Sequence, residues 1–150
     1  KENDPKVREM LGGAYLFRGM IYYSLVSKYR NVQILRQATN EPIANSPEAE
    51  GWAFVEENLS NAIEMCPNFT NKNYVSVQAA KALMARAKIA QGQHAEAAAL
   101  ALEVIEDPSF ALSDFDLIFR GQDNKEEIFT FINNSISKSS RHLTIFSSHK

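Results

Sequence analysis

The side chains that could carry out chemistry are few in this sequence and lie far apart. His94, His142 and His149 follow neither an HExxH pattern nor a Cys/His spacing, so the sequence predicts no metal site. Cys66 is the one cysteine, and the sequence places no base beside it. We therefore interpret it as a buried structural thiol rather than a nucleophile. A glycine-rich phosphate loop is absent as well, and no cofactor is indicated.

Adjacent carboxylates occur twice, at Glu56-Glu57 and at Glu126-Glu127. Neighbouring residues point apart on a helix and to opposite sides on a strand. Glycoside hydrolysis needs two carboxyl groups that converge across a cleft, and neither pair is placed to do so. The sequence therefore predicts a protein that binds and scaffolds rather than an enzyme.

Aromatic side chains are the candidates for ligand contact, because flat rings stack on the apolar faces of sugars. Trp52, the only tryptophan, lies in helical phase with Val55 and Leu59, which favours core packing over a ligand contact. Tyr74 follows the polar run 71–73 in a predicted loop, where it either meets a ligand or packs locally. Trp52 and Tyr74 are the two candidate ligand-binding residues.

Length and charge limit the function classes further. The chain has 150 residues, which suits one core, and a net charge of −2, which gives no electrostatic reason to expect nucleic acid. No apolar run reaches the roughly 18 residues of a transmembrane helix. The segment nearest to that, 14–26, contains Arg18 and Ser24. No signal peptide opens the chain, although one could have been removed upstream.

Four helices are predicted within a region that spans residues 1–108, at about 5–29, 47–66, 76–91 and 94–106. We expect Asp4 to cap the first helix and Ser46 to cap the second. Gly12, Gly13 and Gly19 are poor helix formers, and they predict the close approach of another helix. The connection 30–45 is too long for a simple turn between helices.

The remaining residues, 109–150, read as a tail rich in loops. Residues 114–119 resemble a short helical turn, and residues 127–132 are rich in β-branched and aromatic side chains, which predicts a strand. Such a strand has no obvious partner in this sequence. We therefore expect the natural polypeptide to continue beyond Lys150.

The third and fourth predicted helices match a tetratricopeptide unit in the spacing of small residues, a turn glycine and a final proline. The positions are Ala85, Lys88, Gly92, Ala97, Ala101, Val104 and Pro108, and two depart from the pattern: Lys88 stands where an aromatic residue is usual and Ala101 where a large residue is usual. The first two helices form a second degenerate unit across the long connection. The predicted fold is all-α, an α-α superhelix of degenerate hairpins with a short C-terminal strand or extended tail. Two units are fewer than the roughly three of a freestanding array.

An ordered series of segments over residues 8–132 resembles the SusD/RagB-like outer-membrane nutrient-binding proteins. The segments are 13–32, which ends the first helix and enters the long connection, then Glu41-Pro42, 79–87, 94–105, 110–112, 115–119 and 127–129. Arg30, Gln33 and Ile34 depart from the glycine and proline that are usual in the turn of that family. The chain resembles the central, tetratricopeptide-containing segment of these longer proteins, without their lipid-bearing N-terminal cysteine.

The resemblance implies a non-enzymatic component of a glycan or nutrient uptake system that pairs with a TonB-dependent, SusC-like outer-membrane transporter. It implies a lipoprotein of the cell outer membrane, surface-exposed or facing the periplasm, with an oligosaccharide as the possible ligand. The alternative is a generic tetratricopeptide adaptor that binds a peptide in its concave groove.

Overall fold

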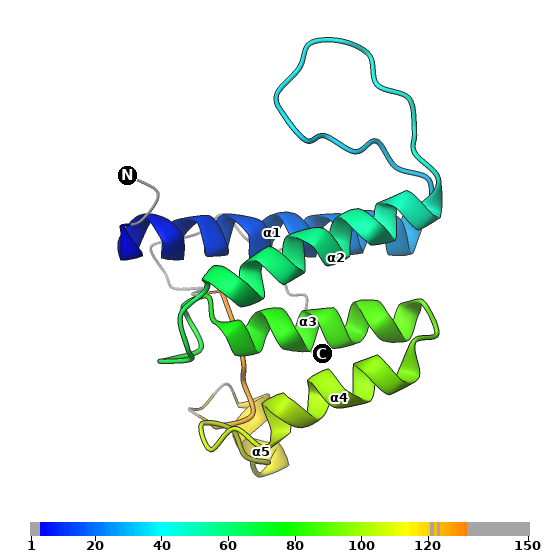
Figure 1. Ribbon diagram of the computed structural model, residues 1–150. Coiled ribbons are helices and arrows are strands. Elements are labelled where there is room, and N and C mark those ends of the chain that lie inside the picture. The colour runs from blue at the N-terminus through cyan, green and yellow to red at the C-terminus, as the bar shows by residue number, and fades with distance from the viewer. Residues whose placement is uncertain (1–3, 121, 123, 132–150) are drawn as a thin grey trace.

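The computed structural model describes residues 4–120, 122 and 124–131, and their regular structure is helical. The helices are α1 (Pro5–Tyr29), α2 (Glu48–Met65), α3 (Val77–Ala90), α4 (His94–Ile105) and α5 (Phe115–Phe119). The predicted all-α fold is confirmed. Figure 1 shows α1 beside α2, followed by α3 and then α4, with α5 at the foot of α4. None of the helices described is long and apolar enough to span a membrane.

The N-cap side chains of α1 and α3 accept a backbone hydrogen bond, whereas those of α2, α4 and α5 do not. Asp4 caps α1 as expected, since its Oδ1 accepts a hydrogen bond from the backbone N–H of Lys6 at 3.0 Å. The prediction that Ser46 caps α2 is wrong. Pro47 occupies the N-cap position of α2, and Ser46 pairs with Val32 in a β-bridge. The side chain of Asn31 takes over the capping role, and its Oδ1 accepts from the N–H of Glu48 at 3.1 Å.

Glycines allow α1 and α2 to approach each other closely. A Cβ atom added at Gly12 would lie 2.7 Å from the backbone nitrogen of Cys66, and one added at Gly19 would lie 2.7 Å from Leu59. On the facing helix, a Cβ at Gly51 would lie 2.7 Å from Val26. The predicted close approach is confirmed for Gly12 and Gly19, and it permits the two helices to share a buried core along their length.

Lys88 joins the second helix to the repeat hairpin. Its side chain is 12% exposed, and its Nζ lies 2.9 Å from a carboxylate oxygen of Glu56 on α2 and 2.9 Å from one of Glu96 on α4. Burial by itself would lower the pKa of Lys88, but the hydrogen bonds and charges of the two glutamates raise it above its usual value. An ion-pair junction therefore stands where a tetratricopeptide unit usually places an aromatic side chain.

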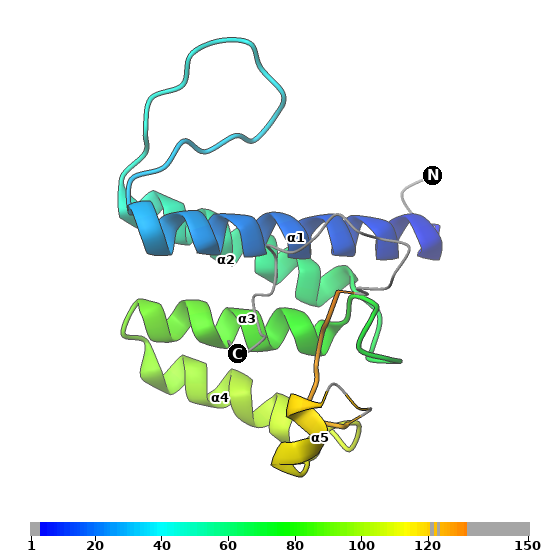
Figure 2. The ribbon, with the colours of Figure 1, turned by 180° about the vertical axis from the view of Figure 1, so that it is seen from behind.

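The segment after α5 differs from its prediction. Residues 127–131 form no strand, so the predicted strand at 127–132 is wrong over its described part, and residues 132–150 lie outside the described residues. A hydrogen bond joins the segment to the connection between α2 and α3, where the N–H of Thr130 donates to the carbonyl of Lys72 at 2.7 Å. Its aromatic rings reach α1, where the centroids of Phe129 and Phe131 lie 6.0 and 6.1 Å from that of Phe17. Figure 2 shows the segment leaving α5 and passing the start of α3.

We expect Gly12→Ala to lower the free energy of unfolding by about 1–3 kcal/mol, because its methyl group would meet the backbone of Met65 and Cys66, which cannot rotate away. Gly13→Ala is the matched control. Its added Cβ would lie 3.4 Å from Val75, and alanine favours the helix by about 1 kcal/mol. Urea unfolding followed by far-UV circular dichroism measures both variants, and equal stabilities would contradict the close contact.

Candidate functional site

The two candidate aromatic residues lie at opposite ends of α2. Trp52 is 7% exposed near the start of the helix, with its ring edge-to-face against Tyr23 at 5.9 Å and its Nε1–H donating to Glu48 at 3.3 Å. Tyr74 is 65% exposed in the connection between α2 and α3. The burial of Trp52 supports the packing interpretation of that residue, whereas Tyr74 presents an accessible ring.

The potentially reactive groups are engaged in structural roles. Cys66 is buried. Its burial, and to a lesser extent the nearby negative charge of Glu9, raises the pKa of its thiol to about 11, so the thiol stays protonated at neutral pH. The adjacent carboxylates bind different cations, since Glu56 pairs with Lys88 and Glu57 with Arg36. Within residues 4–120, 122 and 124–131, no group of three or more histidines, cysteines or carboxylates is placed to hold a metal ion. His142 and His149 lie outside those ranges.

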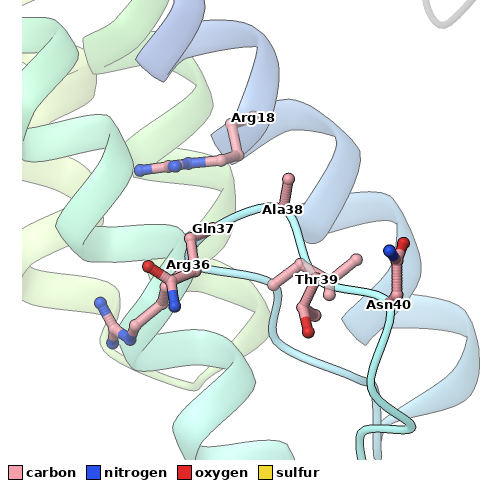
Figure 3. A pocket seen from close by; sticks show the side chains of 7 residues that line it. Arg18, Arg36, Gln37, Ala38, Thr39 and Asn40 are labelled. Atoms are coloured by element: carbon pink, nitrogen blue, oxygen red, sulfur yellow. The ribbon is translucent and has the colours of Figure 1, made fainter.

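An open pocket of about 670 Å³ lies between α1 and the long connection that follows it. Figure 3 shows Arg18 reaching out from α1 above the residues of the connection. The lining residues are Arg18, Leu35, Arg36, Gln37, Ala38, Thr39 and Asn40. Neither Trp52 nor Tyr74 is among them. Sequence reasoning missed this pocket, although the unusual length of the connection was its signal.

The connection, residues 30–47, is anchored at two places: a bridge between its two ends and hydrogen bonds to Tyr22. An antiparallel bridge joins Val32 to Ser46, with the N–H of Ser46 donating to the carbonyl of Val32 at 2.8 Å. The buried hydroxyl of Tyr22 donates to the carbonyl of Gln33 at 3.1 Å and accepts from the N–H of Leu35 at 2.8 Å. These bonds place residues 33–35 over α1, which sets the position of the pocket wall.

The connection begins with a strained turn. Arg30 has φ 59° and ψ −73°, and the N–H of Asn31 donates to the carbonyl of Tyr29 at 2.7 Å, which closes a γ-turn. A side-chain-bearing residue adopts this conformation at a cost of about 1–3 kcal/mol. The sharp reversal directs the chain back along α1 at once. It explains why a glycine would be favoured at this position.

Two arginines that line the pocket lie over the ring of a buried phenylalanine, Phe54. The guanidinium carbons of Arg18 and Arg36 lie 5.2 and 4.9 Å from the ring centroid of Phe54, which is 1% exposed. Arg18 also donates from Nε to the side-chain oxygen of Asn58 at 2.5 Å, and Nη1 of Arg36 contacts both carboxylate oxygens of Glu57 at 3.0 and 2.9 Å. Side chains of α2 therefore hold both guanidinium groups in position at the pocket.

A second, smaller pocket of about 260 Å³ lies beside the connection that carries Tyr74. Its polar lining is largely occupied by internal contacts, because Lys72 pairs with Glu127 and Asn124 donates to Glu127 at 3.2 Å. The backbone N–H groups of Glu126 and Glu127 donate to the side-chain oxygen of Asn124. The larger pocket is therefore the better candidate for a functional site.

No protein-family model matches the chain, and no curated protein sequence matches it. Three of the solved structures that it resembles are named as SusD-like or SusD superfamily proteins. A SusD-like protein from Bacteroides fragilis NCTC 9343 aligns with a TM-score of 0.78 and 26% identity over 89% of this chain. A SusD superfamily protein from Bacteroides thetaiotaomicron VPI-5482 aligns with a TM-score of 0.76 and 18% identity over 87% of it. A laminarin-binding SusD-like protein aligns with a TM-score of 0.73 and 22% identity over 79% of it.

The chain has a SusD-like fold. The resemblance found in the sequence segments is thereby confirmed by the arrangement of the helices. The SusD-like chain covers 29%, 32% and 29% of the lengths of these three neighbours, in the order given above.

We expect Tyr22→Phe to loosen the connection, because it removes two hydrogen bonds and leaves the N–H of Leu35 without that acceptor. The free energy of unfolding should fall by about 1–3 kcal/mol, and trypsin should cleave after Arg36 faster than in the unaltered chain. Tyr23→Phe is the control, since no hydrogen bond of its hydroxyl is found among the described residues. Equal cleavage rates in both variants would show that Tyr22 does not anchor the connection.

Proposed function

We propose that this chain is part of a non-enzymatic, carbohydrate-binding component of a SusD-like outer-membrane uptake system. The carrying observation is the SusD-like fold, whose neighbours include a laminarin-binding protein, a carbohydrate-binding protein of Bacteroides fragilis and a structure with a xylogluco-oligosaccharide. In this proposal the protein captures an oligosaccharide at the cell surface and passes it to a TonB-dependent, SusC-like transporter. Its location is the outer membrane, where it is held as a lipoprotein.

The pocket between α1 and the connection is the proposed place of capture. Gln37, Thr39 and Asn40 offer amide and hydroxyl groups, and Leu35 adds an apolar surface. A sugar ring presents both hydroxyl groups and an apolar face, so a wall that combines the two kinds of contact suits it. The anchors described above hold this wall in place before a ligand arrives, which lowers the entropic cost of binding.

The peptide-adaptor alternative meets an obstacle in the structure. An adaptor would bind its peptide against the first helices of the two units, α1 and α3. In this chain Phe129 and Phe131 already lie against Phe17 on α1, and Thr130 is bonded to the residues that precede α3. The chain's own segment thus covers part of the face that a peptide would need.

Replacement of Gln37 and Asn40 together by alanine should weaken binding to the preferred oligosaccharide about tenfold, because two hydrogen-bonding side chains leave the pocket. A glycan panel identifies that oligosaccharide, and isothermal titration calorimetry then measures its dissociation constant. Asn68→Ala is the matched control, since Asn68 is exposed and lines neither pocket. Absence of binding to every glycan on the panel would refute the proposed function.

Measuring both ligand affinity and the free energy of unfolding distinguishes the roles of the two aromatic candidates, Tyr74 and Trp52. We propose that Tyr74 provides a second, weaker contact, so Tyr74→Ala should weaken binding severalfold and leave the free energy of unfolding within about 0.5 kcal/mol. Trp52→Ala should instead lower the free energy of unfolding by about 3–5 kcal/mol, because it empties part of the core. Calorimetry and urea unfolding of both variants provide the measurement. Unchanged affinity in Tyr74→Ala would exclude that contact.

A further inference from the structure

Arg18 is the residue of the pocket whose charge is least compensated. It is half-buried on α1, and its Nε–H is taken by Asn58, a fully buried side chain that in turn donates to the carbonyl of Phe54 at 2.6 Å. No carboxylate in the described part of the chain pairs with Arg18. Its guanidinium lies 5.2 Å from the ring centroids of both Tyr15 and Phe54, so aromatic faces rather than an acid fix its position.

The terminal nitrogens of Arg18 remain available to a ligand. Every buried side-chain nitrogen or oxygen among the described residues has a hydrogen-bond partner. The described residues offer no such partner to the two Nη atoms of Arg18, so these atoms are accessible, and the side chain lines the pocket. A guanidinium presents its terminal N–H groups as a planar fork that matches two oxygens of one carboxylate.

The remaining lining adds positive charge and no negative charge. Arg36 contributes a second guanidinium, whose charge is balanced by Glu57, a residue outside the lining, through Nη1. The other lining residues found in the described chain are neutral. A positively charged pocket on a chain of net charge −2 is a local feature, and it is not a consequence of overall composition.

We infer that the pocket selects saccharides that carry a carboxylate, such as oligosaccharides of uronic acids. The inference rests on the proposed function and specifies its ligand class. The carboxylate lies against the terminal nitrogens of Arg18, while Gln37, Thr39 and Asn40 contact the hydroxyl groups of the same or the neighbouring sugar. Because Asn58 and the two aromatic rings hold the guanidinium in place, little side-chain entropy is lost when the anion binds.

The test compares acidic oligosaccharides with their own methyl esters, which keep the sugar backbone and remove the charge. Oligogalacturonates, oligomannuronates and oligoglucuronates provide three such pairs, and a neutral glycan panel runs beside them. We expect at least one acid to bind about tenfold or more tightly than its ester. Its affinity should fall as ionic strength rises, whereas the affinity of the ester should not. Acetate at the same concentration shows whether an anion without a sugar suffices, an outcome that would overturn the inference.

Substitutions assign the preference to Arg18. Arg18→Gln should remove most of the difference between acid and ester, and Arg18→Lys should retain part of it, because the charge remains while the fork is lost. Arg8→Gln is the matched control, since Arg8 lies on the same helix and its ion pair with Glu64 is exposed. The measurement of affinity against ionic strength uses the unaltered chain, so it tests the inference even if Arg18→Gln fails to fold.

Two failures can be told apart. Binding of neutral glycans and esters at least as tight as that of the acids would overturn the carboxylate preference and leave the proposed function standing. A loss of preference in Arg8→Gln equal to that in Arg18→Gln would also overturn it. Failure to bind any saccharide, acidic or neutral, would overturn the proposed function and the inference together.

Discussion

The contact between α1 and α2 through Gly12, Gly19 and Gly51 is the constraint on which the other features depend. Without Cβ atoms at these positions, the two helix backbones approach closely enough to bury Val26, Leu59 and their neighbours completely. The same approach sets Arg18 of α1 opposite Asn58 of α2, which fixes the guanidinium at the pocket. The packing of a helix pair and the geometry of the candidate site are therefore one arrangement.

The helices could be predicted from the sequence to within one residue at each end, because their limits are local. Proline before a helix and glycine after one act through their own backbone angles, as φ of 76° at Gly92 shows. The cap at Ser46 was wrong because a residue 15 positions earlier, Asn31, supplies the capping oxygen. A pairing across that distance depends on how the connection folds, and no local pattern encodes it.

The pocket was beyond sequence reasoning for the same reason. Its wall is held by contacts between residues far apart in the chain, such as Tyr22 with Leu35 and Arg36 with Glu57. The sequence marked the connection as unusually long, and it drew attention to aromatic side chains as ligand contacts. The structure buries one of those, Trp52, and the larger pocket relies on arginine and amide groups instead. Aromatic residue type alone therefore did not locate the pocket, because the fold decides which side chains are accessible.

Two tetratricopeptide-like units leave helix faces without a following unit, and this chain covers them unequally. The segment 127–131 lies against α1 and the connection before α3, where its Phe129 packs against the core. The outer face of α4 has no such cover among the described residues, since Leu102 and Ile105 are 52% and 72% exposed. The covering segment bonds to Lys72, beyond the C-terminal end of α2, whereas the pocket's connection leads into the N-terminal end. On α1 itself the two regions are adjacent, because Phe17 packs against the covering segment and Arg18, the next residue, lines the pocket.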